Sequence, residues 1–183
     1  MLDETTVTQD VRALVQEEIR KALERDRATR RATFIASKGT LDWAYPPLIL
    51  STAAAAAGLS AAVFFTFYGL NIIRKDAERV LQVSPVGNPA MPMPVPMPDI
   101  VTAMPGMKSM ATGMMKSMFS KKGVASIQEL IEVARESEVR LIACQMTMEV
   151  FGWREQDFID GVEFGGAAAF LSLARKSHVT LFI

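Results

Sequence analysis

The sequence predicts an α/β fold with a mainly parallel sheet and helices on both faces. Short apolar runs alternate along the chain with segments of helical periodicity, and some of these runs lack the polar alternation of a half-exposed strand. We assign residues 31–183 to this domain, with a proline- and methionine-rich insertion at 85–123. Residues 1–30 form a separate part that contains an N-terminal amphipathic helix.

Composition excludes several classes of protein. The chain has 183 residues, equal numbers of basic and acidic residues, one cysteine and one histidine. Zero net charge argues against nucleic-acid binding, which needs a basic surplus or a basic face. One cysteine cannot form an internal disulfide, and with one histidine it cannot complete a four-ligand zinc site. The acidic N-terminus does not resemble a secretory signal, and we expect a cytoplasmic protein without a metal or cofactor.

Residues 6–28 have the periodicity of an amphipathic helix. An isolated apolar stripe has to be buried, either on the protein's own domain or against a neighbouring subunit. The stripe consists of Val11, Leu14, Val15, Ile19, Ala22 and Leu23.

A stretch without charge at 45–73 has two interpretations. Its length, the aromatic residues at its start and the two basic residues after it suit a transmembrane helix. In the second interpretation, two prolines occupy the first turn of a helix over 44–58, and residues 61–67 form a buried strand. With a strand at 32–36 and a helical segment at 70–82, this gives a right-handed βαβ unit.

The insertion at 85–123 holds seven of the nine prolines and nine of the twelve methionines. Its second half, 107–119, has helical spacing and lysines nearby. Three interpretations of this segment are open. It could be an adaptable surface that docks a protein partner or the surface of a membrane. It could bind Cu(I) through its thioethers, or it could simply pack on the domain. The methionines at helical spacing are Met107, Met110, Met114, Met115 and Met118.

After the insertion, helices and strands alternate again. A capping-box sequence with Ser126 as N-cap begins an amphipathic helix. The following elements are a strand at 139–144, a helical or turn–helix segment at 146–160, a small-residue helix at 166–176 and a terminal strand at 178–183.

Three predicted strands end in residues that suit a binding site. In an open parallel sheet, ligands gather at the carboxyl ends of the strands. Here these ends carry Lys38 and Gly39, Tyr68 and Gly69, and Cys144. The helix expected after Cys144 favours a thiolate through its N-terminal amides, and Lys38 adds a positive charge. The alternative is that Cys144 is a small buried hydrophobic residue.

Two further features bear on the site. Gly165 and Gly166 open a predicted helix, where they let an anion approach the backbone or simply mark close packing. His178 begins the last strand, and we expect it to be structural or solvent-facing. The sequence contains neither a dinucleotide-binding glycine motif nor a P-loop.

Four segments of the sequence resemble the DsrE/DsrF-like family, in the branch often labelled peroxiredoxin-like, whose members carry a methionine-rich insertion. The resemblance covers about residues 31–183 and rests most specifically on the Cys-x-Met-Thr-Met run at Cys144. The segments are FFTFYGLNIIRKD (64–76), LIACQMTMEVFG (141–152), DGVEFGGAAAFLSLA (160–174) and the terminal VTLFI.

This resemblance implies an oligomeric α/β protein that acts as a sulfur carrier or sulfurtransferase in cytoplasmic sulfur trafficking. Rhodanese-like and TusA-like proteins are the partners it implies, and the functional cysteine of the family aligns with Cys144. The chain lacks the second cysteine of some relatives, so a dithiol relay within one subunit is excluded. Some relatives are membrane-attached, which keeps the membrane interpretation open.

The implied mechanism is sulfur transfer through a persulfide or thiosulfonate on Cys144, which requires that the thiol be reachable. Lys38 and backbone amides near Cys144 or at Gly165 and Gly166 would hold the anionic sulfur. Three other functions remain open at this point. They are a one-cysteine thiol peroxidase, an oligomeric docking scaffold that uses the methionine-rich segment, and copper handling by that segment.

Overall fold

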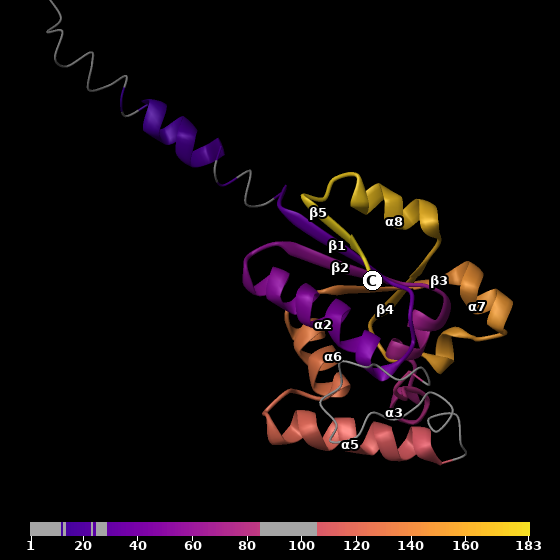
Figure 1. Ribbon diagram of the computed structural model, residues 1–183. Helices are drawn as coiled ribbons and strands as arrows, with labels where there is room; N and C mark the ends of the chain where they lie inside the picture. Colours follow the sequence, from indigo (N-terminus) through magenta and orange to yellow (C-terminus); the bar gives the residue numbers. More distant parts are fainter. Residues whose placement is uncertain (1–11, 13, 23, 25–28, 85–105) are drawn as a thin grey trace, which may run out of the picture.

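The computed structural model describes residues 12, 14–22, 24, 29–84 and 106–183. The domain is an α/β structure around a five-stranded, entirely parallel sheet with the order β4-β3-β2-β1-β5 (Figure 1). The strands are β1 (Arg31–Ala36), β2 (Ser60–Phe65), β3 (Arg140–Cys144), β4 (Val162–Gly165) and β5 (Val179–Phe182). The α-helices are α2 (Leu41–Ala56), α3 (Ala77–Val80), α5 (Met107–Lys121), α6 (Ile127–Glu136), α7 (Gln145–Phe151) and α8 (Ala167–Ala174). The 3-10 helices are η1 (Phe67–Ile73) and η2 (Glu155–Asp157).

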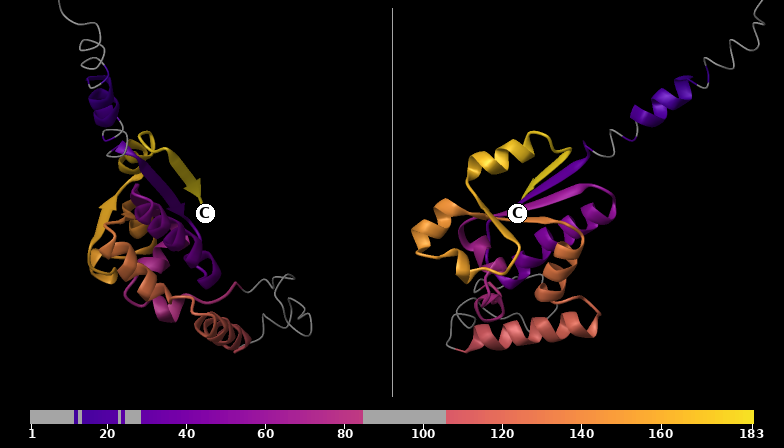
Figure 2. Two further views of the ribbon diagram at one scale, coloured as in Figure 1. Left: turned by 90° about the vertical axis from the view of Figure 1, so that its left-hand side faces the viewer. Right: turned by 180° about the vertical axis from the view of Figure 1, so that it is seen from behind.

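The two faces of the sheet are covered unequally. Side chains of one parity, such as Val63 and Leu141, join the main core beneath α2 and α6. Side chains of the other parity, such as Phe64 and Ile142, form a small second cluster with Phe170 of α8. Successive residues of a strand point to opposite faces, so α8 lies on the face opposite α2 and α6 (Figure 2). The prediction of helices on both faces is therefore confirmed.

The charge-free stretch at 45–73 is a helix followed by a strand. It runs through most of α2, then β2, then η1, and Gly58 ends the helical turn with a φ of 82°. Within the described ranges, none of the helices has the length and apolar character needed to span a bilayer. The fold therefore follows the second interpretation, with one correction: α2 begins at Leu41, so Pro46 and Pro47 lie inside the helix and not in its first turn.

Several predicted elements differ in detail. The helical segment expected at 70–82 is split into η1 and the short α3, and at the break the extended Arg74 pairs with Phe158 while the Lys75 amide donates to the carbonyl of Asp157. The segment expected at 146–160 is α7 followed by η2. The edge strand β4 was not predicted, since it has only four residues between glycines.

The N-terminal helix is confirmed over its described residues, with 14–22 helical. Leu14, Val15 and Ile19 are all exposed, and the helix lies away from the domain in Figures 1 and 2. The apolar side chains of this helix therefore do not pack on the protein's own domain. Val11 and Leu23 of the predicted stripe lie outside the described residues.

Arg140 and Glu163 form a bidentate ion pair between the first residue of β3 and a residue of β4, with N–O distances of 2.8 and 2.6 Å. The pair lowers the pKa of Glu163, chiefly through the hydrogen bonds from Arg140. A depressed folded-state pKa gives stability that is present above the unfolded pKa and is lost as pH falls through the folded value.

We therefore expect Glu163→Gln to lower the free energy of unfolding at pH 7 by roughly 0.5 kcal/mol, because both side chains are half-exposed. The difference from wild type should shrink to nothing in acid, once Glu163 is protonated in both states. Urea denaturation of both proteins at a series of pH values measures this. An unchanged difference between pH 7 and pH 3 would contradict it.

Candidate functional site

The carboxyl ends of β1, β2 and β3 share one edge of the sheet, as the sequence predicted. Ala36 pairs with Phe65 between β1 and β2, and Phe65 pairs with Ala143 between β2 and β3. Cys144 is the next residue, and it pairs with Gly165 of β4. The residues after these strands therefore lie along one edge of the sheet, with Thr66 to Gly69 on the strand next to the cysteine and Ser37 to Gly39 one strand further away.

Cys144 ends β3 and is the N-cap residue of α7, so it lies at the amino end of a helix as expected. Its side chain points to the face covered by α8, where it joins Ala62, Phe64, Ile142 and Phe170 in the small second cluster. The residue is only 3% exposed. The expectation of a reachable thiol is thus not met in this conformation, because the cysteine is enclosed in the cluster between the sheet and α8.

Gly39 and Gly69 let the turns after β1 and β2 lock together. A Cβ atom on Gly69 would lie 2.0 Å from Ala36 O, and one on Gly39 would lie 2.0 Å from Tyr68 O. The amide of Gly69 donates to Ser37 O and Thr66 O at 3.1 and 2.9 Å. These two glycines therefore shape the edge of the sheet beside the cysteine through backbone packing.

Lys38 and Tyr68 are held by aromatic neighbours. The Lys38 ammonium lies 3.2 Å from the ring centroid of Trp43, in a cation–π contact. Tyr68 is 64% exposed and stacks on Phe151 at 5.7 Å. Strand β2 separates β1 from β3, so Lys38 starts about 10 Å from Cys144 and would have to leave Trp43 to approach it.

Gly165 and Gly166 do come next to the cysteine. Gly165 is its pairing partner on β4, and Gly166 is the N-cap residue of α8. A Cβ on Gly165 would lie 3.3 Å from Ala169 Cβ, whereas one on Gly166 would meet nothing within 4 Å. Gly165 therefore serves close packing, while the backbone at Gly166 has open space around it.

Sequence reasoning missed Thr147. Its buried hydroxyl lies 3.3 Å from Thr66 Oγ1 and accepts a hydrogen bond of 3.3 Å from Phe67 N. Phe67 has a φ of 48°, an unfavourable conformation for a residue with a side chain. Thr147 thus ties the turn after β2 to α7. The position of Thr147, three residues after the cysteine, was the signal available in the sequence.

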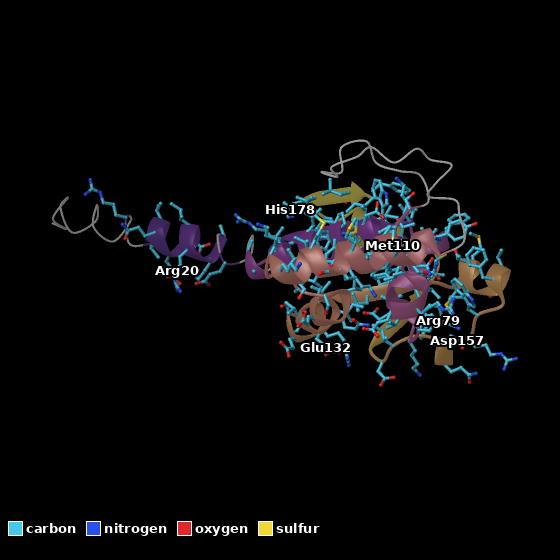
Figure 3. All side chains as sticks on the ribbon, turned by 60° about the horizontal axis from the view of Figure 1, so that its bottom comes forward. Arg20, Arg79, Met110, Glu132, Asp157 and His178 are labelled. Carbon is cyan, nitrogen blue, oxygen red and sulfur yellow. The ribbon has the colours of Figure 1, made fainter. Side chains whose placement is uncertain are left out.

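The remaining candidates lie elsewhere. His178 is exposed just before β5, where Figure 3 labels it, and its amide donates to Arg31 O at 2.8 Å. Helix α5 presents Met110, Met114 and Met118 to solvent, while its opposite side packs on the domain. Among the described residues, histidine, cysteine and acidic side chains form no cluster that could hold a metal ion.

The sequence of this domain is similar to those of known proteins. The sequence profile of the DsrE/DsrF/DrsH-like family matches residues 28–182. The chain belongs to this family. Sulfur carrier protein DsrE2 of Allochromatium vinosum is 51% identical over 158 residues, which are 84% of this chain and 98% of that protein. YrkE of Bacillus subtilis, an uncharacterized protein, is 31% identical over 161 residues, 85% of this chain and 98% of that protein.

Among solved structures, the ychN protein from E. coli has a TM-score of 0.48 and 11% identity, covering 84% of this chain and 99% of that one. The expected membership of the DsrE/DsrF-like family is confirmed by the profile and by the 51% identical relative. Its peroxiredoxin-like label and oligomeric state stay predictions.

Proposed function

We propose that this DsrE-like protein is a cytoplasmic sulfur carrier that holds sulfane sulfur as a persulfide on Cys144. The observation that carries the proposal is its 51% identity to a protein named as a sulfur carrier, across nearly the whole of that protein. Cys144 supports it, because it is the only thiol in the chain and ends a strand at the edge where α/β sheets place ligands.

The chemistry needs one thiolate and no external oxidant. The Cys144 thiolate attacks the outer sulfur of a donor persulfide, a new S–S bond forms, and the donor's S–S bond breaks. The donor leaves as a thiolate with the bonding pair, and the proton stays on the transferred sulfur. An acceptor thiolate then attacks that sulfur and regenerates the Cys144 thiolate. Thiosulfate would load Cys144 by the same displacement, with the thiolate attacking its outer sulfur and sulfite leaving with the bonding pair.

The supporting roles follow from the positions of the predicted residues. Gly165 and Gly166 lead into α8 beside Cys144, so the first amides of α8 are the proposed contacts for anionic sulfur. Gly39 and Gly69 act by shaping the edge. Tyr68 is proposed as a contact for the incoming partner because it is exposed. Lys38 reaches bound sulfur only after it leaves Trp43.

Mass spectrometry of wild-type protein before and after incubation with polysulfide tests the proposal. We expect the mass of one or more sulfur atoms to be added, located on the peptide that contains Cys144 and removed by a reductant. Protein that gains no sulfur from polysulfide or thiosulfate would defeat the proposal.

The partners we propose are a rhodanese-like donor and a TusA-like acceptor, with the carrier assembled as a homo-oligomer. The exposed apolar side chains of the N-terminal helix support assembly, because Leu14, Val15 and Ile19 need a partner surface. Sedimentation of the full chain and of a chain lacking residues 1–28 tests this. If both proteins contain the same number of subunits per particle, the N-terminal helix does not form the interface between subunits.

We also propose that α5 makes a peripheral contact with an anionic membrane surface. Its exposed stripe of Met110, Met114 and Met118, seen in part in Figure 3, adjoins lysines, and residues 107–122 contain four lysines and no acidic residue. Wild-type protein should sediment with phosphatidylserine vesicles at low salt, and a variant with these methionines changed to serine should not. Equal binding of the two proteins would contradict the contact.

A further inference from the structure

Helix α8 is held over Cys144 by very few side chains. Phe170 is its one buried residue, and the Phe170 ring stacks on Phe64 at a centroid distance of 5.0 Å and an interplanar angle of 24°. Leu171, the next residue, is 61% exposed. Cys144 and Phe170 are 3% and 4% exposed and belong to the same cluster. Leu173 and Ala174 of α8 are partly buried against the same cluster, so Phe170 is the one fully buried side chain among the three that α8 contributes to it.

This cluster is separate from the main core of the domain. The main core lies on the other face of the sheet beneath α2 and α6, and it does not include α8. The cost of a local opening is set by the apolar contacts that it breaks. Moving α8 would disturb the small cluster and leave the main core intact, so a local opening should be much easier than unfolding.

The chain on the amino-terminal side of α8 has room to bend. Gly166, the N-cap residue, has a φ of −91° and a ψ of 177°, and no atom lies within 4 Å of the place where its Cβ would be. A residue without a side chain and without neighbours can change its backbone angles at little cost. Gly166 is thus suited to act as the joint between β4 and α8.

We infer that α8 is a cover over Cys144 that opens to admit each sulfur donor and acceptor, and that Phe170 is the residue that holds it closed. Displacement at sulfur needs a second sulfur atom to approach along the S–S axis, and the closed cover leaves no path for it. The closed state in turn shields a carried persulfide from water and oxidants. The roles of admitting sulfur donors and shielding a persulfide rest on the proposed function, whereas the opening of α8 itself does not.

Alkylation of Cys144 by iodoacetamide in the native, full-length protein measures the opening directly. We expect slow labelling of wild type compared with the protein in denaturant, and labelling at least about tenfold faster in Phe170→Ala, since this ring is the one fully buried side chain of α8 and stacks on Phe64. Phe170→Leu should fall between them. Leu171→Ala, which changes an exposed side chain of the same helix, should label as wild type does.

A second control separates the cover from general loosening of the domain. Phe158→Ala removes a buried ring of the main core, 1% exposed, on the other face. It should lower the melting temperature without a comparable gain in native-state labelling. Wild type that labels as fast as the denatured chain, or equal labelling of wild type and Phe170→Ala, would overturn the inference.

Loading the same variants with sulfane sulfur tests the opening of α8 and the sulfur-carrier function separately. We expect loading from polysulfide to be faster in Phe170→Ala by a factor similar to that for labelling. Accelerated labelling with no loading in any variant would support the cover and reject the sulfur carrier. Loading that is as fast in wild type as in Phe170→Ala would reject the cover and keep the carrier.

Discussion

Gly69→Ala should prevent the protein from folding stably. The new Cβ would lie 2.0 Å from Ala36 O and 2.6 Å from Ala36 C, and both are backbone atoms at the end of strand β1. No side chain can rotate to relieve this contact, so the turn after β2 would have to move away from β1. A cost above about 4 kcal/mol is expected, which is a large part of the stability of an ordinary domain.

Circular dichroism and urea denaturation of the purified variant measure this effect. Gly113→Ala is the matched control, because a Cβ there would meet nothing within 4 Å and the residue lies inside α5. That substitution should leave stability unchanged or raise it by about 0.5–1 kcal/mol, since alanine favours a helix more than glycine. Gly69→Ala protein as stable as wild type would show that the two turns are not locked together.

Cys144→Ser should lose all sulfur transfer while it keeps the fold. A hydroxyl group cannot form the S–S bond on which both displacement steps depend, and the chain offers no other thiol to replace it. Serine is close in size to cysteine, so the cluster under α8 should stay packed. The buried hydroxyl should lower the free energy of unfolding by roughly 1–3 kcal/mol.

The measurement is sulfur passed from a persulfide donor to an acceptor thiol in the presence of wild-type or variant protein. We expect the variant to give the rate of the reaction without protein. Thermal melting of the variant serves as the control for folding. If Cys144→Ser transfers sulfur at a rate near that of wild type, Cys144 is not the residue that carries the sulfur.

The arrangement of the strands could be predicted because each strand is short, apolar and separated from the next by a helical segment. The parallel sheet then brings residues that follow the strands to one edge, as found for Gly39, Gly69 and Cys144. Strand β4 escaped prediction, because Val162–Gly165 has a charged residue in the middle and glycines on both sides. Its position at the edge of the sheet explains why so little apolar sequence suffices.

The environment of each side chain was harder to predict. Lys38 was expected near Cys144, yet its ammonium lies over the ring of Trp43, a contact that depends on how α2 begins. The burial of Cys144 depends on which face of β3 its side chain takes and on what lies there. Alternation along β3 places Cys144 with Ile142, but only the fold shows that Phe170 covers that face.

Discharge of a preloaded carrier shows whether Cys144 passes its sulfur to another thiol. Wild-type protein is loaded with polysulfide, freed of excess donor and mixed with an acceptor thiol, and the masses of the Cys144 peptide and of the acceptor are followed together. We expect sulfur to leave Cys144 and to appear on the acceptor in equal amount. Sulfur that stays on Cys144 while the acceptor is in excess, or that is lost as sulfide without reaching the acceptor, would contradict it.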